Sequence, residues 1–206
     1  MNGLVHESAW GRHVDGPVVL VTTVGSAAGA KAAAAALACA GSEPDRAALL
    51  IDLYEGPAPR SSLVATAGAR KLEERLATHL PRAGVASRGC LCRLALPPDG
   101  DWVEAVAAAL PLARESAAVI HLPPALARAA LVEPRIRPTA ALLRADLSED
   151  RALAALAARN LMREGLRLAV LKRPLAWLPG RAALLGALPA SAPGLPIRIR
   201  ERLLAP

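Results

Sequence analysis

Short apolar runs alternate with longer helical segments along the whole chain. The apolar runs contain few polar positions, which is typical of strands buried on both faces of a parallel sheet. In the helical segments the apolar residues recur every three or four positions, as Leu72, Leu76 and Leu80 do. The predicted strands are 17–23, 47–53, 89–96, 117–122, 139–145 and 166–172, and the predicted helices are 31–40, 69–80, 102–114, 126–132 and 149–164.

This order of elements predicts a single-domain α/β fold. Strands joined through helices make right-handed crossovers, so we expect a mainly parallel sheet with helices on both faces, a three-layer sandwich like that of P-loop NTPases. Residues 1–16 form an N-terminal extension before the α/β domain of residues 17–206. Asp101 and Ser148 are the expected N-caps of the helices that follow them, and Gly165 is expected to end a helix.

The composition limits the chemistry that the chain can perform. The 206 residues are 53% hydrophobic but only 2% aromatic, so an aromatic platform for single-stranded nucleic acid is not expected. The net charge of +7 is spread along the sequence, which leaves no strong nucleic-acid signal. No apolar run reaches the ~18 to 20 residues of a membrane span, and the first residues lack a signal-peptide core. We therefore expect a cytoplasmic protein.

The cysteines predict neither a disulfide framework nor a metal site. Cys39, Cys90 and Cys92 are too few for the former. Cys90 and Cys92 lie two positions apart on a predicted strand, so their thiols are expected on the same side of it. A metal site would need further ligands, and the histidines are scattered. Buried structural cysteines are the expectation.

The loop after the first strand is the first candidate ligand site, because ligands of open α/β sheets bind at the carboxyl ends of strands. A phosphate loop has Gly, four residues, Gly, Lys, and then Ser or Thr. Gly25 and Lys31 have this spacing, and Ser26 and Gly29 lie between them. Ala30 stands where the second glycine belongs, and Ala32 stands where the hydroxyl residue belongs. The segment is either a degenerate phosphate loop or a small-residue turn that leads into a helix.

Six segments in the same order resemble the MinD/ParA family of deviant phosphate-loop ATPases. The loop reads VTTVGSAAGAKAA, where family members read VVTSGKGGVGKTT. LIDLY at 50–54 is similar to the family's LIDLD, and VIHLPP at 119–124 is similar to its strand followed by D-x-P-P. TAALLRADLS at 139–148, AVLKRP at 169–174 and LGALP at 185–189 are similar to three later segments of the family. The resemblance runs from about Pro17 to Ile199 and implies the same α/β fold.

The resemblance also implies that the nucleotide site is degenerate. The family's signature lysine falls on Ser26, its Mg²⁺-binding threonine on Ala32, and its switch aspartate on His121, a poor ligand for Mg²⁺. Lys31 and Asp52 keep the family's residue types. In a loop register shifted by one residue, Lys31 falls on the threonine position and the conserved lysine is lost too. We therefore expect no catalytic residue and no firm cofactor, with binding of ATP and Mg²⁺ weakened.

Two functions follow from this resemblance. The first is a non-hydrolysing scaffold or localisation factor of the TadZ/CpaE-like kind, which acts through a protein partner, an intact paralogue or a homodimer. The alternative is a slow nucleotide-dependent ATPase switch of the ParA/MinD type that retains Lys31 and Asp52. Residues 195–204 alternate arginine with apolar residues, which predicts either an edge strand or an amphipathic helix with weak membrane contact. In the scaffold, Lys31→Ala is expected to change stability little.

Overall fold

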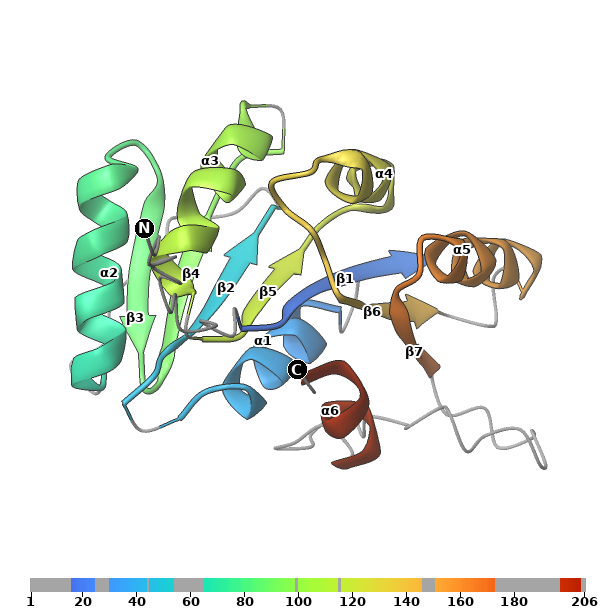
Figure 1. The fold of residues 1–206 in the computed structure, drawn as a ribbon, viewed down its shortest axis with the longest axis horizontal. Coiled ribbons are helices and arrows are strands. Elements are labelled where there is room, and N and C mark those ends of the chain that lie inside the picture. Colours follow the sequence, from blue (N-terminus) through green and yellow to red (C-terminus); the bar gives the residue numbers. More distant parts are fainter. Residues whose placement is uncertain are drawn as a thin grey trace, which may run out of the picture.

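One seven-stranded sheet forms the centre of the molecule (Figure 1). The computed structural model describes residues 16–24, 30–43, 45–53, 65–98, 100–114, 116–145, 151–172 and 197–204. The strand order is β3-β4-β2-β5-β1-β6-β7, and every neighbouring pair is parallel except β3 and β4. The strands are β1 (Val18–Val24), β2 (Ala48–Asp52), β3 (Gly84–Arg88), β4 (Leu91–Ala95), β5 (Ala118–His121), β6 (Ala140–Ala145) and β7 (Arg167–Lys172).

Helices cover both faces of this sheet, which confirms the single-domain α/β fold. Helices α1 (Ala30–Ala40) and α6 (Ile197–Leu204) pack on one face. The other face carries α2 (Ala67–His79), α3 (Trp102–Ala109), the short helix η1 (Leu110–Ala113), α4 (Pro124–Val132) and α5 (Arg151–Arg163) (Figure 1). A mainly parallel sheet between two helical layers is consistent with a P-loop NTPase-like sandwich.

The alternation of side chains along the strands divides the core into two layers. On β1, Val19 and Val21 pack toward α1, whereas Leu20 points to the opposite face. The alanines of α1 are small, so this helix lies close to the sheet and buries Ala33 and Ala34 completely. Close packing of α1 brings the residues of its first turn over the carboxyl ends of the strands.

The edge of the sheet differs from the prediction. The single strand expected over 89–96 is the second strand of an antiparallel hairpin, β3–β4, whose first strand was not predicted. Gly89 takes a positive φ of 56° in the turn, a conformation that glycine adopts without strain. Cys90 belongs to this turn and only Cys92 to β4, so the expectation that both thiols share one side of a strand is wrong.

The ends of α3 and α5 lie close to the positions predicted from the sequence, with one difference. Asp101 is the N-cap residue of α3, as predicted, although its side chain makes no capping hydrogen bond. The helix expected over 102–114 stops being α-helical at Ala109 and continues as η1, near Pro111, whose ring disrupts an α-helix. Gly165 follows α5 with a φ of 76°, as predicted, while Ser148 lies outside the described residues.

The C-terminal segment is a helix rather than an edge strand. Residues Ile197–Leu204 form α6, and Leu203 is fully buried against the sheet with α1. At least part of the apolar surface of this helix therefore belongs to the core of the protein.

Candidate functional site at the carboxyl ends of the strands

Two polar residues end neighbouring strands on the face that α1 covers. Asp52 is the last residue of β2 and His121 the last of β5, and the two are register partners. Side chains alternate between the faces of a sheet, so Asp52 and His121 point to the same side as Leu50 and Val119, which pack near α1. One backbone hydrogen bond, from the N–H of Leu53 to the carbonyl oxygen of His121, continues the pairing just beyond the strand ends.

Four side chains meet at this place, and we call them the Asp52 cluster: Asp52, Lys31, Arg93 and His121. The Lys31 Nζ, from the first turn of α1, lies 2.9 Å from Asp52 Oδ2. The Arg93 Nη2, from β4, donates to the same oxygen over 2.5 Å. The His121 Nδ1 donates to the other oxygen, Oδ1, over 2.9 Å. Both oxygens of the carboxylate are thus engaged by donors of the chain itself.

The cluster keeps Asp52 ionised although the residue is fully buried. Burial by itself would raise the pKa of Asp52, because it disfavours the charged form. Hydrogen bonds from His121 and Lys31 and the positive charge of Arg93 outweigh burial and hold this pKa well below its usual range. His121 is 2% exposed, whereas Arg93 is 24% and Lys31 52% exposed. One side of the cluster therefore faces solvent and the other lies in the core.

The structure brings together three of the residues that the sequence marked. Lys31, Asp52 and His121 belong to the cluster, while Ala30 is buried at the start of α1. Ala32 lies in α1, and Gly25, Ser26 and Gly29 lie outside the described residues. Sequence reasoning missed Arg93. Arg93 is a single charged residue inside an apolar strand, and this could have marked it. Its partner, Asp52, can be identified only once β4 is known to pair with β2.

The described part of the cluster does not fit Mg²⁺. This ion prefers an octahedral shell of hard oxygen ligands. The Asp52 oxygens accept from three donors, two of them cationic, and His121 offers nitrogen. A further cation here would also be repelled by the charges of Lys31 and Arg93. Elsewhere in the described ranges, no group of three or more His, Cys, Asp or Glu residues is placed to hold a metal ion.

A separate cavity of about 440 Å³ lies on the other face of the sheet, between α4 and α5. Thr22, near the end of β1, lines it together with Leu131, Asn160 and Arg163. The Thr22 hydroxyl is buried and has no hydrogen-bond partner among the described residues. Since Thr22 and Asp52 point to opposite faces, the cavity and the Asp52 cluster are distinct features.

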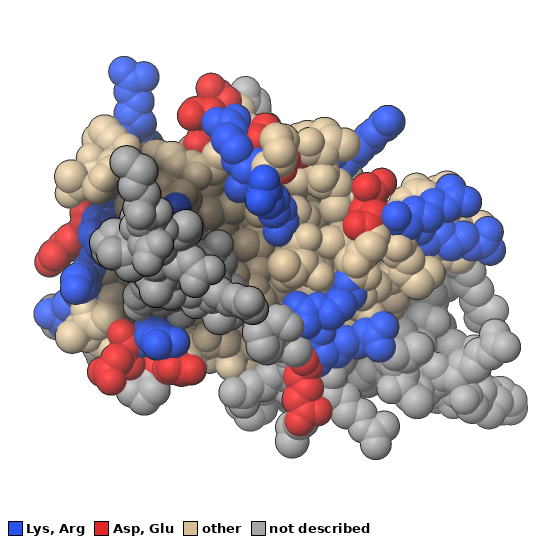
Figure 2. Space-filling view, in the orientation of Figure 1, with Lys and Arg blue, Asp and Glu red and all other residues tan. Residues whose placement is uncertain are grey.

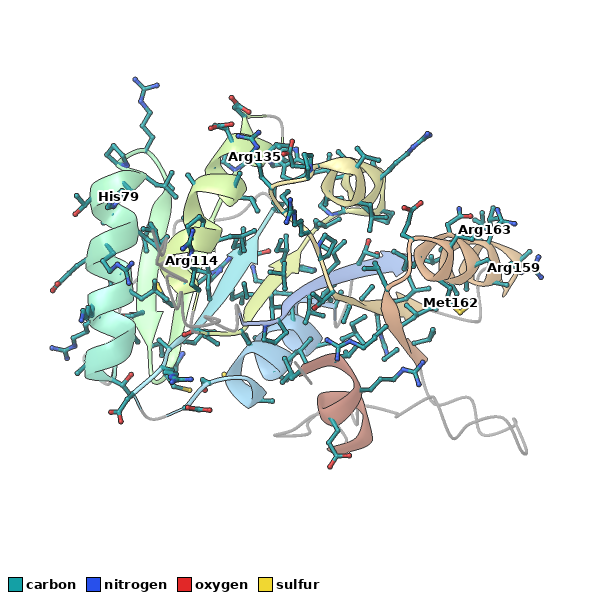
Figure 3. All side chains as sticks on the ribbon, viewed as in Figure 1. His79, Arg114, Arg135, Arg159, Met162 and Arg163 are labelled. Carbon is teal, nitrogen blue, oxygen red and sulfur yellow. The ribbon has the colours of Figure 1, made fainter. Side chains whose placement is uncertain are left out.

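Positively and negatively charged side chains are dispersed over the face of the molecule that Figure 2 shows, rather than gathered in one patch. On the face seen in Figure 2, basic side chains occur at several separate places with acidic ones among them. Arg135, labelled in Figure 3, donates to Glu104 on α3 over 2.6 Å and to Glu133 over 2.7 Å. Such pairing neutralises part of the positive charge locally, so the net charge of the chain does not by itself define a binding surface.

Fold and site together define an α/β sandwich protein with a neutralised carboxylate at the strand ends. The structure is similar to that of a ParA family ATPase from Chlorobium tepidum TLS, with 15% identity, a TM-score of 0.47 and coverage of 76% of this chain and 73% of that chain. No protein-family model and no curated protein matches the sequence. Within the described ranges, no helix is both long and apolar enough to cross a membrane.

Proposed function

We propose that this chain is a degenerate MinD/ParA-like protein that does not hydrolyse ATP and works as a scaffold or localisation factor through protein partners. The observation that carries the proposal is the engagement of both Asp52 oxygens by Lys31, Arg93 and His121. Phosphoryl transfer depends on positioned Mg²⁺ and on cations that contact the phosphates. In this chain a carboxylate at the strand ends and the lysine at the start of α1 neutralise each other.

The residues around the cluster support the same proposal. Ala30, at the start of α1, has no polar side-chain atom, and His121 stands where the resemblance places an acidic switch residue. Lys31 and Arg93 bring two positive charges to one buried negative charge, so the cluster gains nothing from a divalent cation.

Action through a protein partner is supported by the outer surface of α5. Leu153 and Leu156, three residues apart and so on one side of the helix, are both about half exposed. Met162, labelled in Figure 3, is exposed too, but nine residues after Leu153 it lies on the opposite side of the helix. Neighbouring exposed apolar side chains, such as those of Leu153 and Leu156, are a feature of protein-contact surfaces, whereas single ones are ordinary. We place the partner contact on this helix.

The direct test of the enzymatic part is release of phosphate from ATP at saturating Mg²⁺. The native chain, Lys31→Ala and the matched control Lys71→Ala, an exposed lysine of α2, are compared at equal concentration. We expect all three to release phosphate at the rate of the buffer blank. Mg²⁺-dependent release that is lost in Lys31→Ala and kept in Lys71→Ala would establish the ATPase switch instead.

A further inference from the structure

The cavity of about 440 Å³ between α4 and α5 has the construction of a ligand site. Its floor is formed by Thr22 of β1 and Leu143 of β6, which are register partners and therefore project on the same face of the sheet. Its walls come from α4 and α5. Sites for small organic ligands are clefts of about 300 to 1,000 Å³, so the volume suits a small molecule.

Small and apolar side chains make the walls of this cavity. On α4, Pro124, Ala127 and Leu131 line it at helical spacing, and on α5, Ala157 and Leu161 do so. Alanine carries only a methyl group, so Ala127 and Ala157 leave space that longer side chains would occupy. The walls therefore suit the apolar part of a ligand.

The floor carries a polar group that the described residues leave unsatisfied. Thr22 is 4% exposed, and its hydroxyl has no hydrogen-bond partner among the residues that the structure describes. A buried hydroxyl without a partner lowers stability, whereas valine has the same shape and no such cost. A hydroxyl or carbonyl group of a ligand at the floor would satisfy Thr22.

The rim of the cavity carries more positive than negative charge. Arg128 of α4 and Arg163 of α5, the latter labelled in Figure 3, line it and are exposed. Neither arginine makes an ion pair with a residue in the described ranges. Glu164 lines the cavity as well, so the two arginines exceed the acidic charge by one. Guanidinium groups bind carboxylates with charge-assisted hydrogen bonds, which favours an anionic ligand.

We propose that this cavity binds a small organic acid with an apolar middle and a hydroxyl or carbonyl group at the end remote from its carboxylate. The carboxylate lies at the rim between Arg128 and Arg163, and the apolar part contacts the two helices. The remote polar group hydrogen-bonds to the Thr22 hydroxyl, which turns toward it about the Cα–Cβ bond. Because Thr22 and Asp52 project from opposite faces of the sheet, this site does not depend on whether a nucleotide binds at the Asp52 cluster.

The test compares 8-hydroxyoctanoate with octanoate, which has the same charge and apolar chain but no remote hydroxyl. Binding to the 206-residue chain is followed by NMR of the leucine methyl groups. We expect saturable shifts at Leu131, Leu143 and Leu161, which line the cavity, and none at Leu76, a buried residue of α2 that does not line it. The hydroxy acid should bind about 2- to 10-fold more tightly than octanoate, the effect of one net hydrogen bond.

Variants assign the two polar ends of the ligand to their partners. Thr22→Val keeps the shape of the floor, so it should abolish the preference for the hydroxy acid and leave octanoate binding in place. Arg128→Gln combined with Arg163→Gln should weaken both acids about 3- to 30-fold. Arg159→Gln, at an exposed arginine of α5 that does not line the cavity, should change neither affinity.

Three results would overturn the proposal. The first is the absence of shifts at the lining leucines with millimolar 8-hydroxyoctanoate. The second is equal affinity of the native chain for the two acids, or a preference for the hydroxy acid that persists in Thr22→Val. The third is an affinity that the paired substitutions of Arg128 and Arg163 leave unchanged.

Discussion

Asp52 and His121 are register partners on neighbouring parallel strands, and a hydrogen bond of 2.9 Å joins their buried side chains. His121 contacts the Oδ1 of the Asp52 carboxylate on the side of the core, and Lys31 and Arg93 contact its Oδ2. This arrangement makes the charge of Asp52 part of the stability of the fold. It also leaves little of the carboxylate for an external ligand.

Removing the charge of Asp52 should destabilise the protein strongly. Asp52→Asn leaves the cationic groups of Lys31 and Arg93 next to a buried neutral amide, and breaking a buried pair in this way costs about 3 to 5 kcal/mol. Asp101→Asn, at an exposed position without a capping hydrogen bond, should cost less than about 0.5 kcal/mol. Urea unfolding of the two variants measures the difference. Equal and small losses would mean that the cluster does not stabilise the fold.

The carboxylate of Asp52 should also make the free energy of unfolding fall at low pH. The pKa of Asp52 in the folded protein lies below its ordinary value of 3.8, so below about pH 4 the unfolded chain binds more protons than the folded one. The contribution of Asp52 is therefore complete at neutral pH and is lost as the pH falls. Unfolding midpoints between about pH 6 and pH 3 should decline more steeply for the native chain than for Asp52→Asn. Parallel declines would contradict the assigned pKa direction.

Arg93 should matter more for stability than Lys31. Both contact the same oxygen of Asp52, but Lys31 is half exposed, and ion pairs in solvent contribute at most about 1 kcal/mol. Arg93 is three-quarters buried, so water weakens its interaction with Asp52 less than it weakens that of Lys31. Arg93→Met therefore removes the stronger of the two ion pairs. We expect the larger fall in the free energy of unfolding for Arg93→Met, measured by urea titration. The reverse order would show that α1 holds the cluster together.

The outer surface of α5 should be dispensable for folding. Leu156 is about half exposed whereas Leu161, on the same helix, is buried. Leu161→Ala should therefore cost about 2 to 5 kcal/mol, and Leu156→Ala less than about 0.5 kcal/mol. Thermal unfolding of the two variants distinguishes a free surface from core. A large loss in Leu156→Ala would remove this helix as the proposed partner contact.

Much of the fold was predictable because buried strands and alanine-rich helices leave clear sequence patterns. Strand β3 was missed because Gly84–Arg88 is short, contains Ser87 and ends in an exposed arginine, so it lacks a continuous apolar run. Asp101 occupies the predicted N-cap position of α3, but the residue type alone does not determine whether its side chain makes the capping hydrogen bond, and in the structure it does not.

The site was predictable only in part. Lys31, Asp52 and His121 were found through the resemblance and through their places at the ends of predicted strands or the start of a helix. Arg93 could not be assigned, since its contact with Asp52 depends on the register between β2 and β4.

Binding of ATP and ADP by titration calorimetry, with and without Mg²⁺, tests the central claim most directly. Because the oxygens of Asp52 are held by Lys31, Arg93 and His121, we predict no binding at millimolar nucleotide and no effect of Mg²⁺. Micromolar, Mg²⁺-dependent binding that collapses in Lys31→Ala would contradict the scaffold and show a working nucleotide site.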